Sequence, residues 1–92
     1  MDLLPLSLVV ATRQPWPFAR ECIEQLCRQA APMGAEILLA DGTGVGLSEE
    51  FLGRNPRLRW MKIPGASVFE LRARAVGVAR GEIVALTEDH CL

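Results

Sequence analysis

The sequence predicts an α/β fold, a Rossmann-like, mostly parallel sheet of about four strands with flanking helices. Two features of the 92 residues support this prediction. Short apolar runs are typical of strands that are buried on both faces of a parallel sheet. Segments with apolar residues at helical spacing alternate with these runs, and clusters of Pro and Gly separate them. A chain of this length can form at most one small domain.

The first part of the chain predicts a strand, a helix and a second strand. Residues 6–11 (LSLVVA) form a nearly continuous apolar run, which predicts the first strand. In residues 18–30 the apolar side chains recur every three or four positions, so they share one face of a helix. Pro32 and Gly34 end that helix, and residues 35–40 (AEILLA) predict a second buried strand.

The middle of the chain predicts a loop, a short helix and a third strand. Residues 41–46 (DGTGVG) contain three Gly, which disfavour any regular element. Residues 47–54 (LSEEFLGR) are compatible with a short helix. Residues 57–63 (RLRWMKI) alternate in part between apolar and polar side chains, which predicts the third strand.

The last part of the chain predicts a capped helix and a fourth strand. Ser67 and Glu70 have the spacing of a capping box, in which each side chain binds the backbone N–H of the other residue. We expect the helix to run to about Arg80, where Gly81 stops it. Residues 82–87 (EIVALT) predict the fourth strand. Strands that alternate with helices in this way imply a parallel sheet with right-handed crossovers.

The composition argues against several classes of partner. The net charge of −1 provides no strong field for nucleic acid or an anionic membrane, so we expect neither partner. No stretch reaches the roughly 18–20 apolar residues of a membrane span, although a longer parent protein could be membrane-associated. Three cysteines do not form a disulfide framework, so we expect reduced thiols and a cytoplasmic location.

The carboxyl ends of parallel strands all lie at the same end of the sheet, and ligands bind in the crevice just beyond them. Thr12, Arg13 and Asp41 follow the first two predicted strands. Two interpretations of Asp41 stay open: it binds the base or ribose of a nucleoside, or it forms a turn or a helix cap. The three Gly that follow Asp41 also have two interpretations: they form the phosphate loop of another doubly wound nucleotide-binding domain, or they form a flexible turn.

Residues 88–91 (EDHC) place four side chains that can bind a metal or a proton after the fourth predicted strand. Alternate residues of an extended segment share a face, so Glu88 and His90 point one way and Asp89 and Cys91 the other. An acid and an imidazole at a strand end are suited to one divalent cation, and the imidazole favours Mn²⁺ over Mg²⁺. A structural zinc site, which needs four converging ligands, and a solvated acidic turn are the alternatives.

Together these segments resemble the start of a family 2 glycosyltransferase, a large GT-A class that uses nucleotide-diphosphate sugars. VVATRQP is similar in part to the family's opening Pro-Thr-Tyr-Asn-like motif, and LLADGTG keeps the last acid, the Gly and a hydroxyl of Asp-Asp-Gly-Ser. LRARAVGVARGE resembles the helix that holds Ala-Arg-Asn and ends in Ala-x-Gly-Glu, with Arg72 at the Arg position. TEDHC stands at the Asp-x-Asp metal motif, with Glu88 and His90 in place of the two acids.

The resemblance implies a role for each motif. The segment around Thr12 would hold the nucleoside, with Asp41 on the base or ribose, and Arg72 would help to bind the nucleotide. Glu88 and His90 would hold Mn²⁺ or Mg²⁺ across the diphosphate, with Mn²⁺ favoured, and so neutralise the leaving group. The residues that the resemblance assigns to nucleotide binding are Thr12, Arg13, Asp41, Arg72, Glu88 and Asp89.

The implied reaction is metal-dependent transfer of a sugar from a nucleotide-diphosphate sugar to a hydroxyl acceptor. The resemblance covers essentially all of residues 1–92 and makes them the N-terminal, nucleotide-binding part of a GT-A domain. The family carries its acceptor site and catalytic base later in the sequence. We therefore expect this chain to be the donor-binding half, with the remainder of the parent domain as a partner. The alternative is a non-catalytic nucleotide-binding or pseudo-enzyme module of Rossmann-like fold.

Overall fold

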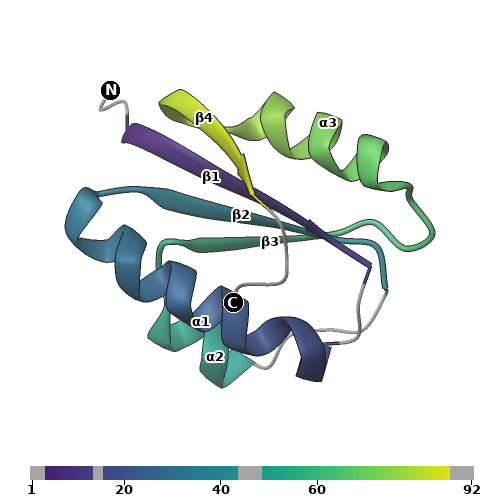
Figure 1. Ribbon diagram of the computed structural model, residues 1–92, viewed down its shortest axis with the longest axis horizontal. Coiled ribbons are helices and arrows are strands. Elements are labelled where there is room, and N and C mark those ends of the chain that lie inside the picture. Colours follow the sequence, from purple (N-terminus) through teal and green to yellow (C-terminus); the bar gives the residue numbers. More distant parts are fainter. Residues whose placement is uncertain (1–3, 14–15, 44–48, 88–92) are drawn as a thin grey trace.

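In the computed structural model, which describes residues 4–13, 16–43 and 49–87, four parallel strands form one sheet with helices on both faces (Figure 1). The elements in chain order are β1 (Leu4–Thr12), α1 (Trp16–Ala30), the 3-10 helix η1 (Ala31–Met33), β2 (Glu36–Asp41), α2 (Glu49–Arg54), β3 (Leu58–Lys62), α3 (Val68–Val78) and β4 (Gly81–Thr87). The strand order across the sheet is β3-β2-β1-β4. The predicted α/β class with a parallel sheet of four strands is confirmed.

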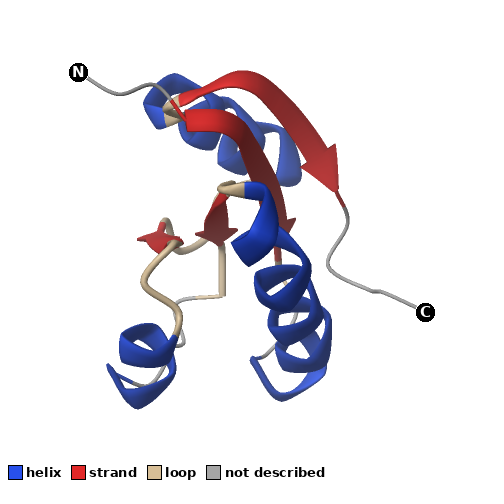
Figure 2. Cartoon of the chain, turned by 90° about the vertical axis from the view of Figure 1, so that its left-hand side faces the viewer, coloured by secondary structure: helices blue, strands red, loops and turns tan. Residues whose placement is uncertain are grey.

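Each face of the sheet has its own hydrophobic core. Figure 2 shows α3 above the strands and the other two helices below them. The core under α1 and α2 contains the buried side chains Val10, Ile23, Ala30, Ala35, Ile37, Leu39, Phe51 and Leu58. The core under α3 contains Val9, Ala11, Leu38, Ala40, Ala66, Leu71 and Ala75. Because helices cover both faces, every residue of β2 is buried, which agrees with the apolar sequence of its four central residues, 37–40.

The sequence of α1 explains which of its faces contacts the sheet. Cys22, Ile23 and Ala30 are buried, whereas Arg20 and Glu21 are exposed. The predicted apolar stripe of this helix is therefore confirmed over its described side chains. Burial of such a stripe, more than intrinsic propensity, stabilises a helix of this length.

The helix α3 begins at the predicted capping box. The Ser67 hydroxyl accepts a hydrogen bond from the Glu70 backbone N–H at 3.2 Å, and the Ser67 N–H donates to Glu70 Oε1 at 3.4 Å. The helix ends at Val78, earlier than the predicted end at Arg80, because Ala79 is already extended (φ −66°, ψ 140°). Gly81 lies beyond the helix end, so its predicted role as the helix stop is wrong.

Gly81 has a different structural role at the start of β4. A Cβ atom at this position would lie 2.5 Å from the Ser7 backbone nitrogen and 2.7 Å from the Leu6 carbonyl carbon. Only a residue without a side chain allows β4 to approach β1 this closely at that point.

The chain reverses its progress across the sheet at β1. It moves from β1 through β2 to β3 on one side, and α3 then returns it over the other face to β4, on the opposite side of β1. In open α/β sheets, ligands bind outside the carboxyl ends of the strands at such a reversal. The topology therefore indicates a ligand site at the carboxyl ends of β1 and its neighbours.

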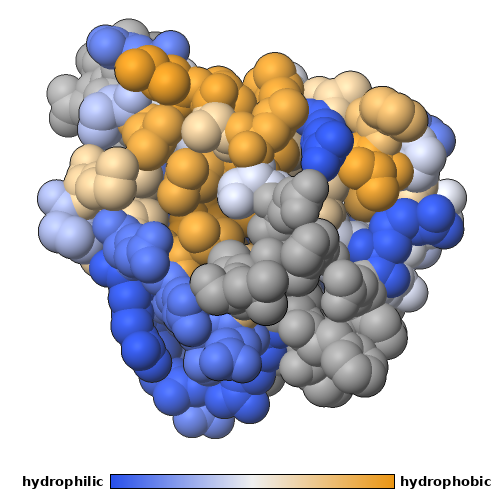
Figure 3. All heavy atoms as spheres, viewed as in Figure 1, coloured by the Kyte–Doolittle hydropathy of each residue, from blue (hydrophilic) through white to orange (hydrophobic). Residues whose placement is uncertain are grey.

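The two edge strands differ in composition and exposure. The five residues of β3 include Arg59 and Lys62, and charged residues of this kind protect sheet edges from association. In β4 the apolar side chains Ile83 and Leu86 are 65% and 54% exposed. Figure 3 shows a hydrophobic surface over β1 and β4. The apolar run at 82–87 thus forms an exposed edge of the sheet.

Two predictions from composition can be compared with the structure. Cys27 is a free thiol, as expected, whereas Cys22 is disulfide-bonded, so the prediction of reduced thiols is wrong for Cys22. The sequence could not reveal this, because cysteine spacing does not determine which side chains meet in the fold. Within the described ranges, none of the helices is both long and apolar enough to cross a membrane.

Candidate functional site

The carboxyl ends of β1, β2 and β3 are joined by backbone hydrogen bonds. Thr12 of β1 is the register partner of Asp41 in β2, which in turn pairs with Lys62 in β3. Just beyond the strands, the Gly42 N–H donates to the Thr12 carbonyl at 2.9 Å, and the Ile63 N–H donates to the Asp41 carbonyl at 2.8 Å. The fold therefore places two of the predicted nucleotide-binding residues, Thr12 and Asp41, side by side at the hydrogen-bonded ends of adjacent strands.

The carboxylate of Asp41 is held in one orientation by neutral donors. The residue is 4% exposed. Its Oδ1 accepts from the Thr43 backbone N–H at 2.8 Å and from the Thr43 hydroxyl at 2.7 Å, and its Oδ2 accepts from Trp60 Nε1 at 3.2 Å. The turn-forming interpretation of Asp41 is thus confirmed. An ionised carboxylate has about four acceptor positions, so these three bonds leave one on Oδ2.

The same turn bears on the Gly-rich segment after Asp41. The Thr43 amide donates to Asp41, so the carboxylate already engages it. In a phosphate loop, consecutive backbone amides of this kind donate hydrogen bonds to the bound phosphate. Gly44 and Gly46 lie outside the described residues, so the phosphate-loop interpretation is untested there and is weaker at Thr43.

Trp60 and Lys62 also belong to this end of the sheet, although neither was predicted from the sequence as a site residue. The half-buried Trp60 donates to Asp41, and Lys62 Nζ lies 6.0 Å from the centroid of the Trp60 ring, at the limit of a cation–π contact. A signal for Lys62 was present, because it is the last residue of the third strand. The alternating pattern of residues 57–63 predicts a strand end one residue later, at Ile63.

The first turns of α3 lie against the loop that follows β2. A Cβ atom at Gly42 would be 3.2 Å from the Ala66 carbonyl oxygen and from Leu71 Cδ1, and 3.5 Å from Arg13 Cγ. Arg13 therefore approaches the same glycine as Leu71, and Arg72 is the next residue of α3. The Nε of Arg72 is buried and has no hydrogen-bond partner within the described chain. A buried donor of this kind is costly until a ligand or water accepts its hydrogen.

The predicted metal ligands Glu88 and His90, and Asp89 between them, lie outside the described residues, so their roles stay predictions. Within residues 4–13, 16–43 and 49–87, His, Cys, Asp and Glu side chains form no group of three that could hold a metal. Thr87, the last residue of β4, pairs with Val10 of β1. β4 thus ends at the same end of the sheet as Asp41.

A second buried polar cluster lies at the opposite, amino end of the sheet. Glu36 is 3% exposed, and its Oε2 accepts from the Ser7 hydroxyl at 2.6 Å and from the Arg80 N–H at 2.7 Å. Its Oε1 accepts from Arg59 Nη1 at 3.0 Å, in a salt bridge. The Ser7 hydroxyl also accepts from the Gly81 N–H at 2.8 Å. The cluster ties β1, β2 and β3 to the turn before β4.

The environment of Glu36 favours its ionised form. Burial alone raises the pKa of this carboxyl. Hydrogen bonds from Ser7, from the Arg80 amide and from Arg59, together with the charge of Arg59, outweigh burial and hold the pKa below its usual value. The group is therefore a charged, internally paired element of the fold.

The chain matches no model of a known protein family and no curated protein. The resemblance to glycosyltransferases therefore depends on the four sequence motifs and their order.

Proposed function

We propose that this chain is the nucleotide-binding part of a metal-dependent glycosyltransferase similar to family 2, and that it binds a nucleotide-diphosphate sugar at the carboxyl end of the sheet. Asp41 is the observation that carries the proposal. It is a nearly buried carboxylate at the end of a central strand, fixed by neutral donors, and it takes part in no ion pair within the described chain. A ligand with hydroxyl or N–H donors would complete its environment.

The strand order supports the position of the proposed site. The reversal at β1 is the place where open α/β sheets bind ligands. Thr12 ends β1 and Arg13 follows it, while Asp41 is the register partner of Thr12. A nucleotide at this position would contact the ends of the two central strands.

The geometry of Asp41 suits recognition of a nucleoside. Thr43 and Trp60 fix both carboxylate oxygens in the absence of a ligand, so little side-chain entropy is lost on binding. The acceptor position that remains on Oδ2 fits one ribose hydroxyl or one base N–H. This is the role that the family resemblance implies for Asp41.

Arg13 and Arg72 supply positive charge for a diphosphate. Neither residue is in an ion pair within the described chain, and the Nε of Arg72 is a buried donor that lacks an acceptor. A guanidinium can bind phosphate oxygens through two parallel charge-assisted hydrogen bonds. A bound phosphate would therefore satisfy the donor that the folded chain leaves without a partner.

The proposal assigns Glu88 and His90 to a divalent cation. When bound, Mn²⁺ or Mg²⁺ supplies charge neutralisation at the diphosphate leaving group as the sugar departs. The imidazole of His90 favours Mn²⁺. Asp89 is proposed to help bind the nucleotide.

Isothermal titration calorimetry of the folded chain with UDP-sugars and GDP-sugars tests this proposal. We expect saturable binding of at least one donor in the presence of Mn²⁺, and weaker binding after EDTA removes the metal. If no donor produces heat with a sample that circular dichroism shows to be folded, the proposed function is wrong.

Paired variants separate the roles of the individual residues. Arg72→Gln should weaken donor binding about tenfold or more, because a charge-assisted bond to phosphate is lost. Arg74→Gln is the matched control on the same helix, since Arg74 is exposed, and it should leave binding unchanged. The double change Glu88→Ala and His90→Ala should remove only the Mn²⁺-dependent part. Equal losses from Arg72→Gln and Arg74→Gln would exclude the assigned role of Arg72.

A further inference from the structure

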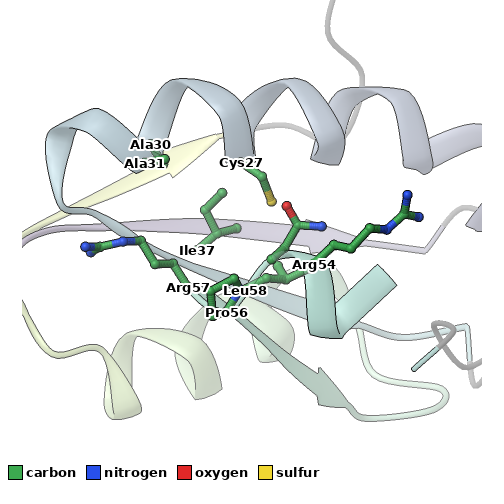
Figure 4. A pocket seen from close by; sticks show the side chains of 9 residues that line it. Cys27, Ala30, Ala31, Ile37, Arg54, Pro56, Arg57 and Leu58 are labelled. Atoms are coloured by element: carbon green, nitrogen blue, oxygen red, sulfur yellow. The ribbon is translucent and has the colours of Figure 1, made fainter. Parts of the chain in front are cut away.

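A small cavity lies at the amino end of the sheet, away from the proposed nucleotide site. It has a volume of about 130 Å³ and opens between the last turns of α1 and the turn that joins α2 to β3. Its floor is formed by Cys27, Ala30, Ile37 and Leu58, and Figure 4 shows Cys27 on α1 above Ile37 on the sheet. An apolar cavity of about 150 Å³ can hold benzene, so this one accepts a group close to the size of a six-membered ring.

Arginine side chains surround the mouth of this cavity. Arg54 and Arg57 line it, and Figure 4 shows their guanidinium groups extending to opposite sides of the opening. A second hollow of about 170 Å³ shares Arg54 and Asn55 with the cavity and adds Arg28. The two hollows form one surface feature, which we call the α1–α2 groove.

The positive charge of the groove is not neutralised within the described chain. The ion pairs there join Arg20 to Glu24 and Arg59 to Glu36, so Arg28, Arg54 and Arg57 have no carboxylate partner. Glu24 also lines the second hollow, but it already binds Arg20 at 3.0 Å. The groove therefore combines an apolar floor with unpaired cations.

The thiol of Cys27 does not change this character. Burial and the nearby charge of Glu24 raise the pKa of Cys27 above its usual value, so the thiol is neutral at pH 7. A neutral thiol behaves as a small apolar group and is a poor nucleophile. The floor of the cavity is thus suited to noncovalent contact with an apolar group.

We propose that the α1–α2 groove is a second binding site, which takes a small organic anion with an apolar body and a single carboxylate. The apolar body, a ring or a short alkyl chain, would fill the cavity above Ile37. The carboxylate would lie at the mouth, where Arg57 binds it through two parallel hydrogen bonds and Arg54 adds positive charge. This site is independent of the proposed nucleotide site, because the two lie at opposite ends of the strands.

Titrations of the full chain with benzoate, benzyl alcohol and acetate, followed by ¹H–¹⁵N NMR at low ionic strength, test this proposal. Benzoate combines ring and charge, benzyl alcohol has the ring alone, and acetate has the charge alone. We expect saturable shifts of the Cys27, Ile37 and Leu58 amides with benzoate, and at least about fivefold weaker binding of the other two probes. Equal affinity for benzoate and benzyl alcohol would show that the arginines do not recognise the anion, and would overturn the proposal.

Variants locate the site. Arg57→Ala should weaken benzoate binding about fivefold, whereas Arg74→Ala, which removes an exposed arginine from α3, should not change it. Cys27→Leu fills the cavity and should abolish the benzoate shifts, while circular dichroism reports whether the variant is folded. If Cys27→Leu does not fold, the comparison of Arg57→Ala with Arg74→Ala decides alone. Equal effects of those two changes, or an absence of saturable benzoate shifts in the unmodified chain, would refute the second site.

Discussion

Two carboxylates at opposite ends of the sheet have nearly the same burial and different surroundings. Glu36 is 3% exposed and Asp41 is 4% exposed, and each accepts three hydrogen bonds. Glu36 is paired with the guanidinium of Arg59. Asp41 is held by a hydroxyl, an amide and an indole, all of them neutral.

The difference indicates what each end of the sheet does. A buried carboxylate with its own cation and donors contributes to the fold, and removing it leaves buried partners unsatisfied. A buried carboxylate held only by neutral donors has no cation beside it, which favours a ligand that brings donors or positive charge. We therefore interpret the Glu36 network as structural and the carboxyl end of the sheet around Asp41 as the place where the nucleotide-diphosphate sugar binds.

The largest effect is expected at the amino end. Glu36→Ala should lower the free energy of unfolding by about 3 kcal/mol, because it leaves the buried donors of Ser7 and Arg80 without an acceptor and removes the carboxylate partner of Arg59. Glu24→Ala is the control. It breaks a surface pair whose side chains are 54% and 32% exposed, and it should cost at most about 0.5 kcal/mol. Urea denaturation measures both, and equal costs would contradict the structural role of Glu36.

A second large effect is expected where β4 joins β1. Gly81→Ala places a methyl group 2.5 Å from a backbone nitrogen, so β4 must shift, and we expect a loss of about 2–3 kcal/mol. Gly77→Ala is the matched control in α3, where an added Cβ meets nothing within 4 Å. That change should stabilise the helix by about 0.5–1 kcal/mol. Thermal unfolding that shows the same sign for both variants would contradict the described approach of β4 to β1.

The pH dependence of stability should report the pairing of Glu36. The pKa of Glu36 is lower in the folded chain than the usual 4.5. Its ionised carboxylate therefore makes its full contribution to the free energy of unfolding at pH values above 4.5. The contribution is lost as the pH falls through the lowered folded pKa. In urea titrations from pH 7 to pH 3, the stability difference between the wild-type chain and Glu36→Gln should shrink on acidification. A constant difference would mean that the carboxylate is not stabilised by folding.

The smallest effect on stability is expected at Asp41. Asp41→Asn keeps the shape of the side chain and an acceptor for Thr43 but turns an amide NH2 group toward the Trp60 N–H, so it should cost about 1–2 kcal/mol. The same change removes the charge and should weaken donor binding by at least tenfold. Parallel measurements of unfolding and of donor binding separate the two effects. A large loss of stability with unchanged binding would reverse the roles assigned to the two ends of the sheet.

Local sequence signals were sufficient to predict most of the fold. The apolar runs marked the strands, and the capping box at Ser67 marked the start of α3, because both depend on residues close together in the chain. The place of β4 beside β1 in the strand order was not predictable. An apolar run indicates a strand, but the order of strands depends on how the chain returns across the sheet.

The candidate site was predictable only in part, for the same reason. Asp41 could be found from its place at the end of a strand, but its contact with Trp60 joins residues 19 positions apart. The network around Glu36 spans 29 positions to Ser7 and 44 to Arg80, and no local pattern marks it. The pairing of a charged residue inside a strand becomes visible only when the sheet is assembled.

The central claim, that a nucleotide-diphosphate sugar binds at the carboxyl end of the sheet and not at the Glu36 network, is tested most directly by ¹H–¹⁵N NMR. A nucleotide-diphosphate sugar is added to the folded chain with Mg²⁺, and amide and indole signals are followed. We predict shifts at the Gly42 and Thr43 amides and at the Trp60 indole N–H, whose acceptor is Asp41, with the Gly81 amide unchanged. Shifts at Gly81 without shifts at Trp60 and Gly42 would contradict the claim.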